Sequence, residues 1–210
     1  MKSYAKLTSG LIGAWFALIL TLSALHVFKV RPSQPPLPFG IAALTPIVAF
    51  LVWFAASPAF RQFTLSLSPQ VLTIVQSWRI AGFVFVVLAA YGLLPLAFAM
   101  PAGWGDIAIG ATAPLVALKL ANPSHRTSFI VWQLLGIADL VTAVTMGTLA
   151  GIIDPHGIPT TAMTVLPMSL IPTFAVPLFF ILHIISIAHA RQWPAQQGQP
   201  ASQPLPLQAL

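Results

Sequence analysis

The stretch S-F-I-V-W-Q-L-L-G-I-A-D-L-V-T-A-V-T-M-G-T-L-A-G, residues 128–151, is a long apolar run with one acid, Asp139, near its middle. About 20 apolar residues in a helix are enough to cross a bilayer. A carboxylate at membrane depth is costly unless it is neutral, hydrated or paired. Asp139 is therefore the first candidate for a functional or ion-pairing residue. Small residues recur along the same run, including G-x-x-x-G at 147–151, which lets a neighbouring helix approach closely.

The composition of the whole chain agrees with this stretch. Of 210 residues, 58% are hydrophobic and 6% are charged, whereas a soluble domain carries about 25% charged residues. Such a chain has too little polar surface to cover a core in water. The sequence therefore predicts an all-α, multi-pass membrane protein, because helices satisfy their own backbone hydrogen bonds in lipid.

The net charge of +6 does not indicate a nucleic-acid partner. The nine basic residues are scattered singly among apolar runs and form no continuous phosphate-binding patch. The expected partner is the lipid bilayer, and a second membrane protein or another copy of the chain stays open. The chain has no cysteine, which excludes disulfides, thiolate catalysis and Cys-ligated metals.

The apolar runs predict a bundle of six transmembrane helices within a single domain, residues 1–191. We expect the spans at about 7–28, 39–60, 69–94, 104–120, 128–151 and 167–189. The Gln/Pro-rich tail at 192–210 is expected to be disordered. The first apolar run is longer than the usual core of a signal peptide, so we expect it to be retained, with cleavage as the alternative.

The third span decides where Arg79 lies. Ser68 followed by Pro69 is typical of a helix start, with Ser68 as the N-cap and proline at the first helical position. A helix from Pro69 puts Arg79 about 15 Å along it, inside the membrane. In the alternative, residues 63–78 lie along the interface and Arg79 marks the membrane boundary.

Asp106 follows the segment M-P-A-G-W-G at 100–105. The proline and glycines predict an outward connection there, with Asp106 opening the fourth span. A carboxylate at that position can cap the free N–H groups of a helix start. Capping is favoured over substrate binding, and Asp106 is expected at a different depth from Asp139.

The distribution of lysine and arginine predicts the orientation. With six spans, one face receives most of the basic residues at or beyond the span ends: Lys2, Lys6, Arg61, Lys119, Arg126 and Arg191. The other face receives Lys29 and Arg31. Because basic loops stay inside, this distribution predicts that both termini are cytoplasmic, in a bacterial-type inner membrane.

Three ionisable residues fall at similar depths. Measured from the cytoplasmic ends of their spans, Arg79, Asp139 and His183 lie roughly 10–17 Å deep, so they could meet. We expect an Arg79–Asp139 ion pair. Two hypotheses follow. One is a small-solute or proton-coupled transporter component in which Asp139, His183, Arg79 and Asp106 bind substrate or relay protons. The other is a structural or accessory subunit whose buried charges specify helix packing.

An intramembrane hydrolase is a third hypothesis and is not favoured. It would require an outward cavity that holds Asp106, Asp154 and His156 together. The chain contains no H-E-x-x-H motif, no G-x-S-x-G motif and no glutamate. We therefore assign no catalytic residue, no cofactor and no metal.

Overall fold

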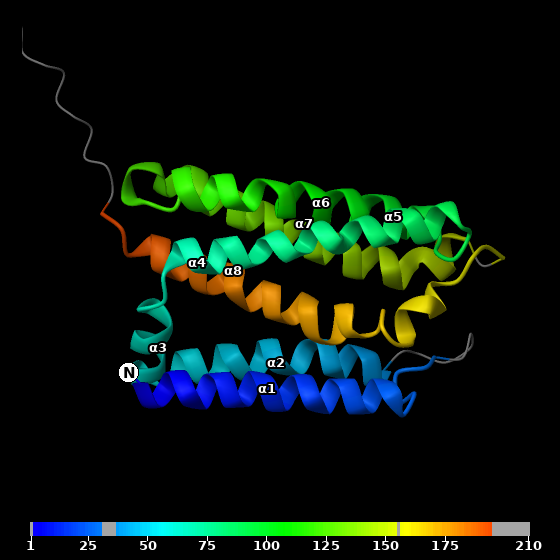
Figure 1. The fold of residues 1–210 in the computed structure, drawn as a ribbon, viewed down its shortest axis with the longest axis horizontal. Coiled ribbons are helices and arrows are strands. Elements are labelled where there is room, and N and C mark those ends of the chain that lie inside the picture. Colours follow the sequence, from blue (N-terminus) through cyan, green and yellow to red (C-terminus); the bar gives the residue numbers. More distant parts are fainter. Residues whose placement is uncertain (1, 31–36, 155, 195–210) are drawn as a thin grey trace, which may run out of the picture.

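The structure is a computed structural model that describes residues 2–30, 37–154 and 156–194. All regular secondary structure in these ranges is helical. The long helices run side by side and alternate in direction (Figure 1). The segment 31–36 and most of the predicted tail, 195–210, lie outside the described residues.

The first two long helices are α1 (Lys2–Ala24) and α2 (Leu37–Ala56). The predicted second span, 39–60, is too long, because Ser57 ends it. The Ser57 side chain accepts a hydrogen bond from the backbone N–H of Phe60, which starts a separate short helix, α3 (Pro58–Leu65). Ring contacts of Phe60 with Tyr4 and Trp53 hold α3 against the start of α1 and the end of α2.

The third segment is continuous and consists of α4 (Pro69–Val75), the 3₁₀ stretch η1 (Gln76–Gly82) and α5 (Phe83–Ala90). Ser68 caps it by accepting from the N–H of Val71, which confirms the predicted start. Residues 69–90 are long and apolar enough to cross a membrane as one unit. Arg79 lies midway along this segment, which supports the first of its two predicted placements.

Helix α6 (Leu96–Lys119) begins earlier than predicted, and α7 (Arg126–Ile153) follows it. The predicted connection at 100–105 is wrong, because α6 runs straight through Pro101 and the turn lies at 91–95. The glycines there serve close packing instead of a turn. A Cβ at Gly103 would lie 3.1 Å from the carbonyl oxygen of Gly82 on the neighbouring segment.

The last segment starts irregularly. A 3₁₀ turn, η3 (Thr160–Thr164), precedes the π-helical turn η4 (Ile171–Ala175), which continues into α8 (Val176–Arg191). The predicted sixth span began at 167, but the continuous helical segment begins at Ile171 and ends at Arg191. Pro172 lies in η4 and Pro177 lies in the first turn of α8, and each removes a backbone donor from the regular α-helical pattern.

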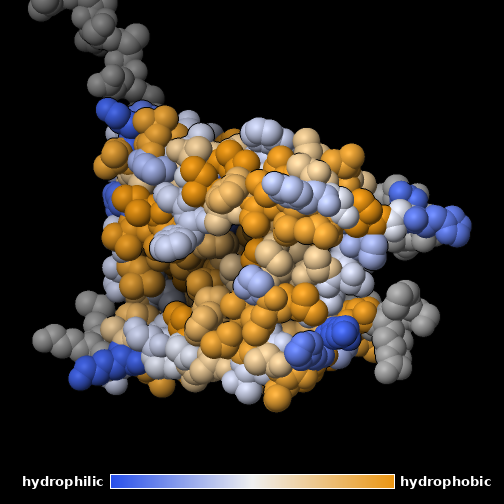
Figure 2. Space-filling model, turned by 45° about the vertical axis from the view of Figure 1, so that its right-hand side comes forward, coloured by the Kyte–Doolittle hydropathy of each residue, from blue (hydrophilic) through white to orange (hydrophobic). Residues whose placement is uncertain are grey.

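Five helical segments within the described residues are long and apolar enough to cross a membrane: 3–24, 37–56, 69–90, 123–150 and 171–191. This indicates a membrane protein. The face in Figure 2 is largely hydrophobic, with the hydrophilic residues gathered mainly toward its edges.

The centre of the bundle is enclosed by the segment 69–90 and helices α6, α7 and α8. Helix α6 packs against η1, α5 and α7, and α7 packs against α8. Helix α2 contacts α8 and η4, whereas α1 is peripheral. Gly147 allows α7 to approach α6, since a Cβ there would already touch the ring of Phe98 at 3.4 Å. The four enclosing segments position all the ionisable residues discussed next.

Candidate functional site

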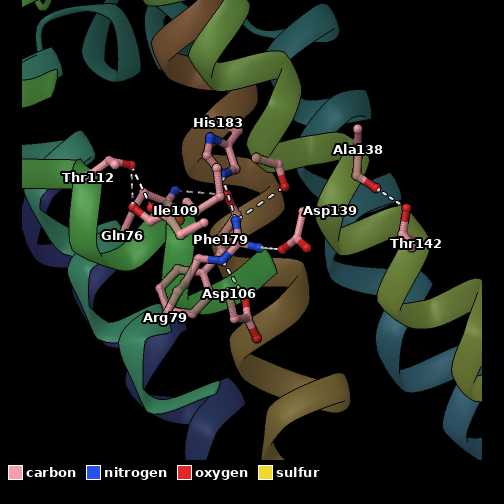
Figure 3. Close-up of polar contacts among 12 residues, drawn as sticks. Gln76, Arg79, Asp106, Ile109, Thr112, Ala138, Asp139, Thr142, Phe179 and His183 are labelled. Atoms are coloured by element: carbon pink, nitrogen blue, oxygen red, sulfur yellow. Dashed lines mark hydrogen bonds and ion pairs between the residues drawn. The ribbon is translucent and has the colours of Figure 1, made fainter. Parts of the chain in front are cut away.

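Arg79 occupies the middle of the bundle and binds two acids. Its side chain is 0% exposed. Its Nε donates to Oδ1 of Asp106 at 2.7 Å, and its Nη2 donates to Oδ2 of Asp139. Figure 3 shows the guanidinium between these two carboxylates. The predicted Arg79–Asp139 pair is therefore present.

The role predicted for Asp106 is wrong. Asp106 lies well inside α6, which begins at Leu96, so it cannot cap the helix start. It also lies at the same depth as Asp139, because both carboxylates bind one guanidinium. The predicted cap depended on a helix start at 104. Once the helix begins a few turns earlier, the same carboxylate faces the bundle centre.

His183 joins the cluster from α8. Its Nε2 lies 3.2 Å from Nη1 of Arg79, and its Nδ1 lies 2.5 Å from Oε1 of Gln133. A guanidinium can only donate hydrogen bonds, so Nε2 must be the acceptor. The proton is then on Nδ1, which donates to Gln133. The geometry thus assigns His183 as neutral imidazole with a defined tautomer.

The hydrogen bonds continue from His183 toward the N-terminal end of α4. Nε2 of Gln133 donates to Oγ1 of Thr73 at 3.2 Å, and Oγ1 of Thr73 donates to the carbonyl oxygen of Pro69 at 2.7 Å. Arg79, His183, Gln133 and Thr73 are all buried. We call this series the polar chain. All of its hydrogen bonds are donated in the same direction, from the guanidinium of Arg79 toward the carbonyl of Pro69.

Two partners of the cluster were not identified from the sequence. Thr73 was missed, and the carbonyl of Gly136, which accepts from Nη1 of Arg79 at 3.2 Å, was missed as well. Thr73 precedes Arg79 by the same interval as Gln133 precedes Asp139. That matched spacing on two neighbouring helices was the signal available. Thr142, three residues after Asp139, does not join the cluster, because its Oγ1 donates to the carbonyl of Ala138 in its own helix.

Glycines make room for the charged side chains. A Cβ at Gly105 would overlap the carboxylate of Asp139, and one at Gly136 would overlap the ring of His183. A Cβ at Gly82 would overlap the side chain of Asp106. The ion pairs therefore fit only because the opposing helix surface is bare backbone at these points.

The polar chain gives a testable consequence at Gln133. The change Gln133→Leu leaves Nδ1–H of His183 without an acceptor in a buried site. We expect the free energy of unfolding to fall by about 1–3 kcal/mol, the cost of an unsatisfied buried donor. Tryptophan fluorescence during denaturation in mixed micelles would measure it.

The matched control for this change is Gln62→Leu, because Gln62 is exposed on α3. We expect that variant to stay within about 0.5 kcal/mol of the parent, as exposed substitutions usually do. Equal losses in the two variants would contradict the role given to the polar chain.

The outward acid cluster required by a hydrolase is not formed. Asp154 ends α7, about 22 Å from Asp139 at ~1.5 Å per residue. Asp106 lies beside Asp139, so it is equally remote from Asp154. Among the described residues, no group of three or more His, Asp or Glu side chains could hold a metal ion.

The cluster has an unbalanced charge. One guanidinium faces two carboxylates, and His183 is neutral, so the cluster carries a net charge of about −1 when both acids are ionised. The carboxylates are the least sealed members, with side-chain exposures of 14% for Asp106 and 13% for Asp139. Each uses one oxygen for Arg79, which leaves the second oxygen of each acid available for a proton or a water molecule.

A family model described as a domain of unknown function, DUF8737, matches residues 36–191. The match includes α2 to α8 and therefore every residue of the cluster. No curated protein and no solved structure matches the chain.

Proposed function

The chain belongs to the family of the domain of unknown function DUF8737, and we propose that it is a multi-pass membrane component that binds and releases a proton at Asp106 and Asp139. In this proposal the proton drives or accompanies the movement of a small solute. Arg79 holds the two acids together, and His183 holds Arg79 in place.

The single observation that carries this proposal is the sharing of one buried arginine by two acids. A net negative charge in the centre of an apolar bundle is costly. One proton on the pair Asp106/Asp139 makes the cluster neutral. Two carboxyl groups that share one proton form a site whose charge changes by one unit on proton release. That change is what coupling to a proton gradient requires.

We further propose six membrane crossings with both termini cytoplasmic, in a bacterial inner membrane. Two features support this: α6 lies among the five apolar segments in alternating direction (Figure 1), and the basic residues gather at one end of the bundle. The elements at that end carry the following residues: Lys6 in α1, Arg61 in α3, Lys119 in α6, Arg126 in α7 and Arg191 in α8.

A packing role is the second candidate. It is favoured by the complete burial of the Arg79 side chain and by its four hydrogen-bonding partners. Buried ion pairs can fix the register of helices without any transport. In that case the chain would be an accessory or structural subunit of a membrane assembly.

Infrared spectroscopy of the purified protein in liposomes distinguishes the two roles. The chain has only three acidic residues, Asp106, Asp139 and Asp154, so a side-chain carboxyl band can be assigned by single substitutions. We expect a protonated-carboxyl band at neutral pH that disappears reversibly as the pH is raised. Both Asp106→Asn and Asp139→Asn should abolish it.

The matched control is Asp154→Asn, which changes the acid at the end of α7 and should leave the band and its pH response unchanged. If no protonated-carboxyl band is found in the parent protein, the proton-binding site does not exist. A band that persists at every pH at which the protein stays folded would favour the packing role.

A further inference from the structure

We propose that the buried acids exchange protons with water at one end of the bundle only, the end formed by the start of α1, helix α3 and the α6–α7 connection. This inference rests on the proposed function, because it names the side on which the proton-binding cluster is open. We call this the α3 end, and the end that contains the α5–α6 turn the opposite end (Figure 1).

Polar groups connect the cluster to the α3 end. The polar chain leads from Arg79 through His183 and Gln133 to Thr73, and it ends at the carbonyl of Pro69. Pro69 directly follows Ser68, which is exposed. The buried side chains are therefore hydrogen-bonded from the centre of the bundle to the first turn of α4.

Other polar groups lie along the same half of the bundle. Gln76 is 1% exposed, and its Oε1 has no hydrogen-bond partner. Ser77 Oγ is likewise buried without a partner. Ser186, one turn beyond His183 toward the α3 end, is 1% exposed, and its Oγ donates to the carbonyl oxygen of Leu182 at 2.9 Å. The unpartnered oxygens of Gln76 and Ser77 are of the kind to which internal water binds.

The half between the cluster and the opposite end is apolar where α5, α6 and α7 meet. No polar side chain occurs in α5, F-V-F-V-V-L-A-A. The buried residues there form one contiguous set that we call the apolar plug: Phe85, Ala89, Leu94, Phe98, Ala99, Ala102, Ala150 and Met163. Leu94, Ala99 and Ala102 are 0% exposed. Water has no hydrogen-bonding partner in such a region, so the plug blocks proton exchange.

Two buried polar residues lie outside the plug at the start of the last segment. Thr173 and Ser169 are 0% exposed. Oγ1 of Thr173 donates to the carbonyl of Ser169 one turn away, which satisfies Thr173 locally, whereas Oγ of Ser169 is buried without a partner. Within the part of the chain that the structure describes, neither side chain hydrogen-bonds to a member of the polar chain, so the two residues do not extend it.

Cysteine accessibility tests the inference in the full-length protein, because the parent chain contains no cysteine. Thr73→Cys and Ser186→Cys place a thiol beside the polar chain, and Ala99→Cys and Ala102→Cys place one in the apolar plug. Each variant is reconstituted in sealed vesicles and treated from one side with a membrane-impermeant methanethiosulfonate. We expect labelling of Thr73→Cys or Ser186→Cys from the α3 side only, and none of the plug variants from either side.

Gln62→Cys on α3 and Tyr91→Cys at the α5–α6 turn serve as orientation markers, because both native residues are exposed, at opposite ends. Labelling of a plug variant from the Tyr91 side would overturn the inference, and so would absence of labelling at both Thr73→Cys and Ser186→Cys. The infrared band of the parent protein is measured separately. If the parent protein shows no such band but labelling is one-sided, only the proton-binding site is refuted. If the band is present but a plug variant is labelled, only the one-sided access is refuted.

Discussion

Replacing Arg79 by methionine is expected to lower the free energy of unfolding by about 3–5 kcal/mol, the usual cost of removing one partner from a buried ion pair. Methionine fills much of the same volume, so the loss reports charge and hydrogen bonding more than a cavity. Asp106 and Asp139 would face each other without a cation, and Nε2 of His183 would lose its donor. Denaturation in mixed micelles, followed by tryptophan fluorescence, would measure the change.

Two further variants make the Arg79 result specific. Arg191→Met changes an exposed arginine at the end of α8 and should cost less than about 0.5 kcal/mol. Adding Asp106→Asn and Asp139→Asn to Arg79→Met removes the uncompensated charges, so most of the lost stability should return. A triple variant no more stable than Arg79→Met alone would mean that the loss comes from packing and not from charge.

The second large effect is expected at Gly110, where α6 meets the backbone of η1. A Cβ at this position would overlap the backbone nitrogen of Ile80 and lie 3.0 Å from the carbonyl carbon of Arg79. Backbone cannot rotate away as a side chain can. We expect Gly110→Ala to destabilise the protein by about 3 kcal/mol, at the upper end of the usual cost of overpacking, and to weaken both ion pairs of Arg79.

The control for Gly110 is the same substitution in open space. Gly13 lies inside α1, and nothing lies within 4 Å of a Cβ built there. Gly13→Ala should be neutral, or stabilising by up to about 1 kcal/mol, because alanine favours the helix over glycine. If both alanine variants behave alike, the close approach of α6 and η1 is not important for stability.

Most of the helical segments were predictable because each depends on a local property, the length and hydropathy of a run. Residues 69–90 are an example, since Ser68 and Pro69 define the helix start by capping chemistry within a single turn. The boundary of α6 was not predictable in the same way. Pro101, Gly103 and Gly105 carry the signals of a turn. Only the packing of α6 shows that Gly103 accommodates the segment 69–90 and that Gly105 accommodates the side chain of Asp139 on α7.

The sequence by itself determined that the chain is helical and apolar enough for a membrane, and that an acid, a cation and a histidine fall at similar depths in it. It could not determine that Asp106 joins them, because the depth of a residue depends on where its helix begins, and its facing partner depends on the rotation of that helix. Only the tertiary structure fixed both quantities. It did so through contacts between residues far apart in the chain, such as Gly110 against the backbone of Arg79 and Ile80.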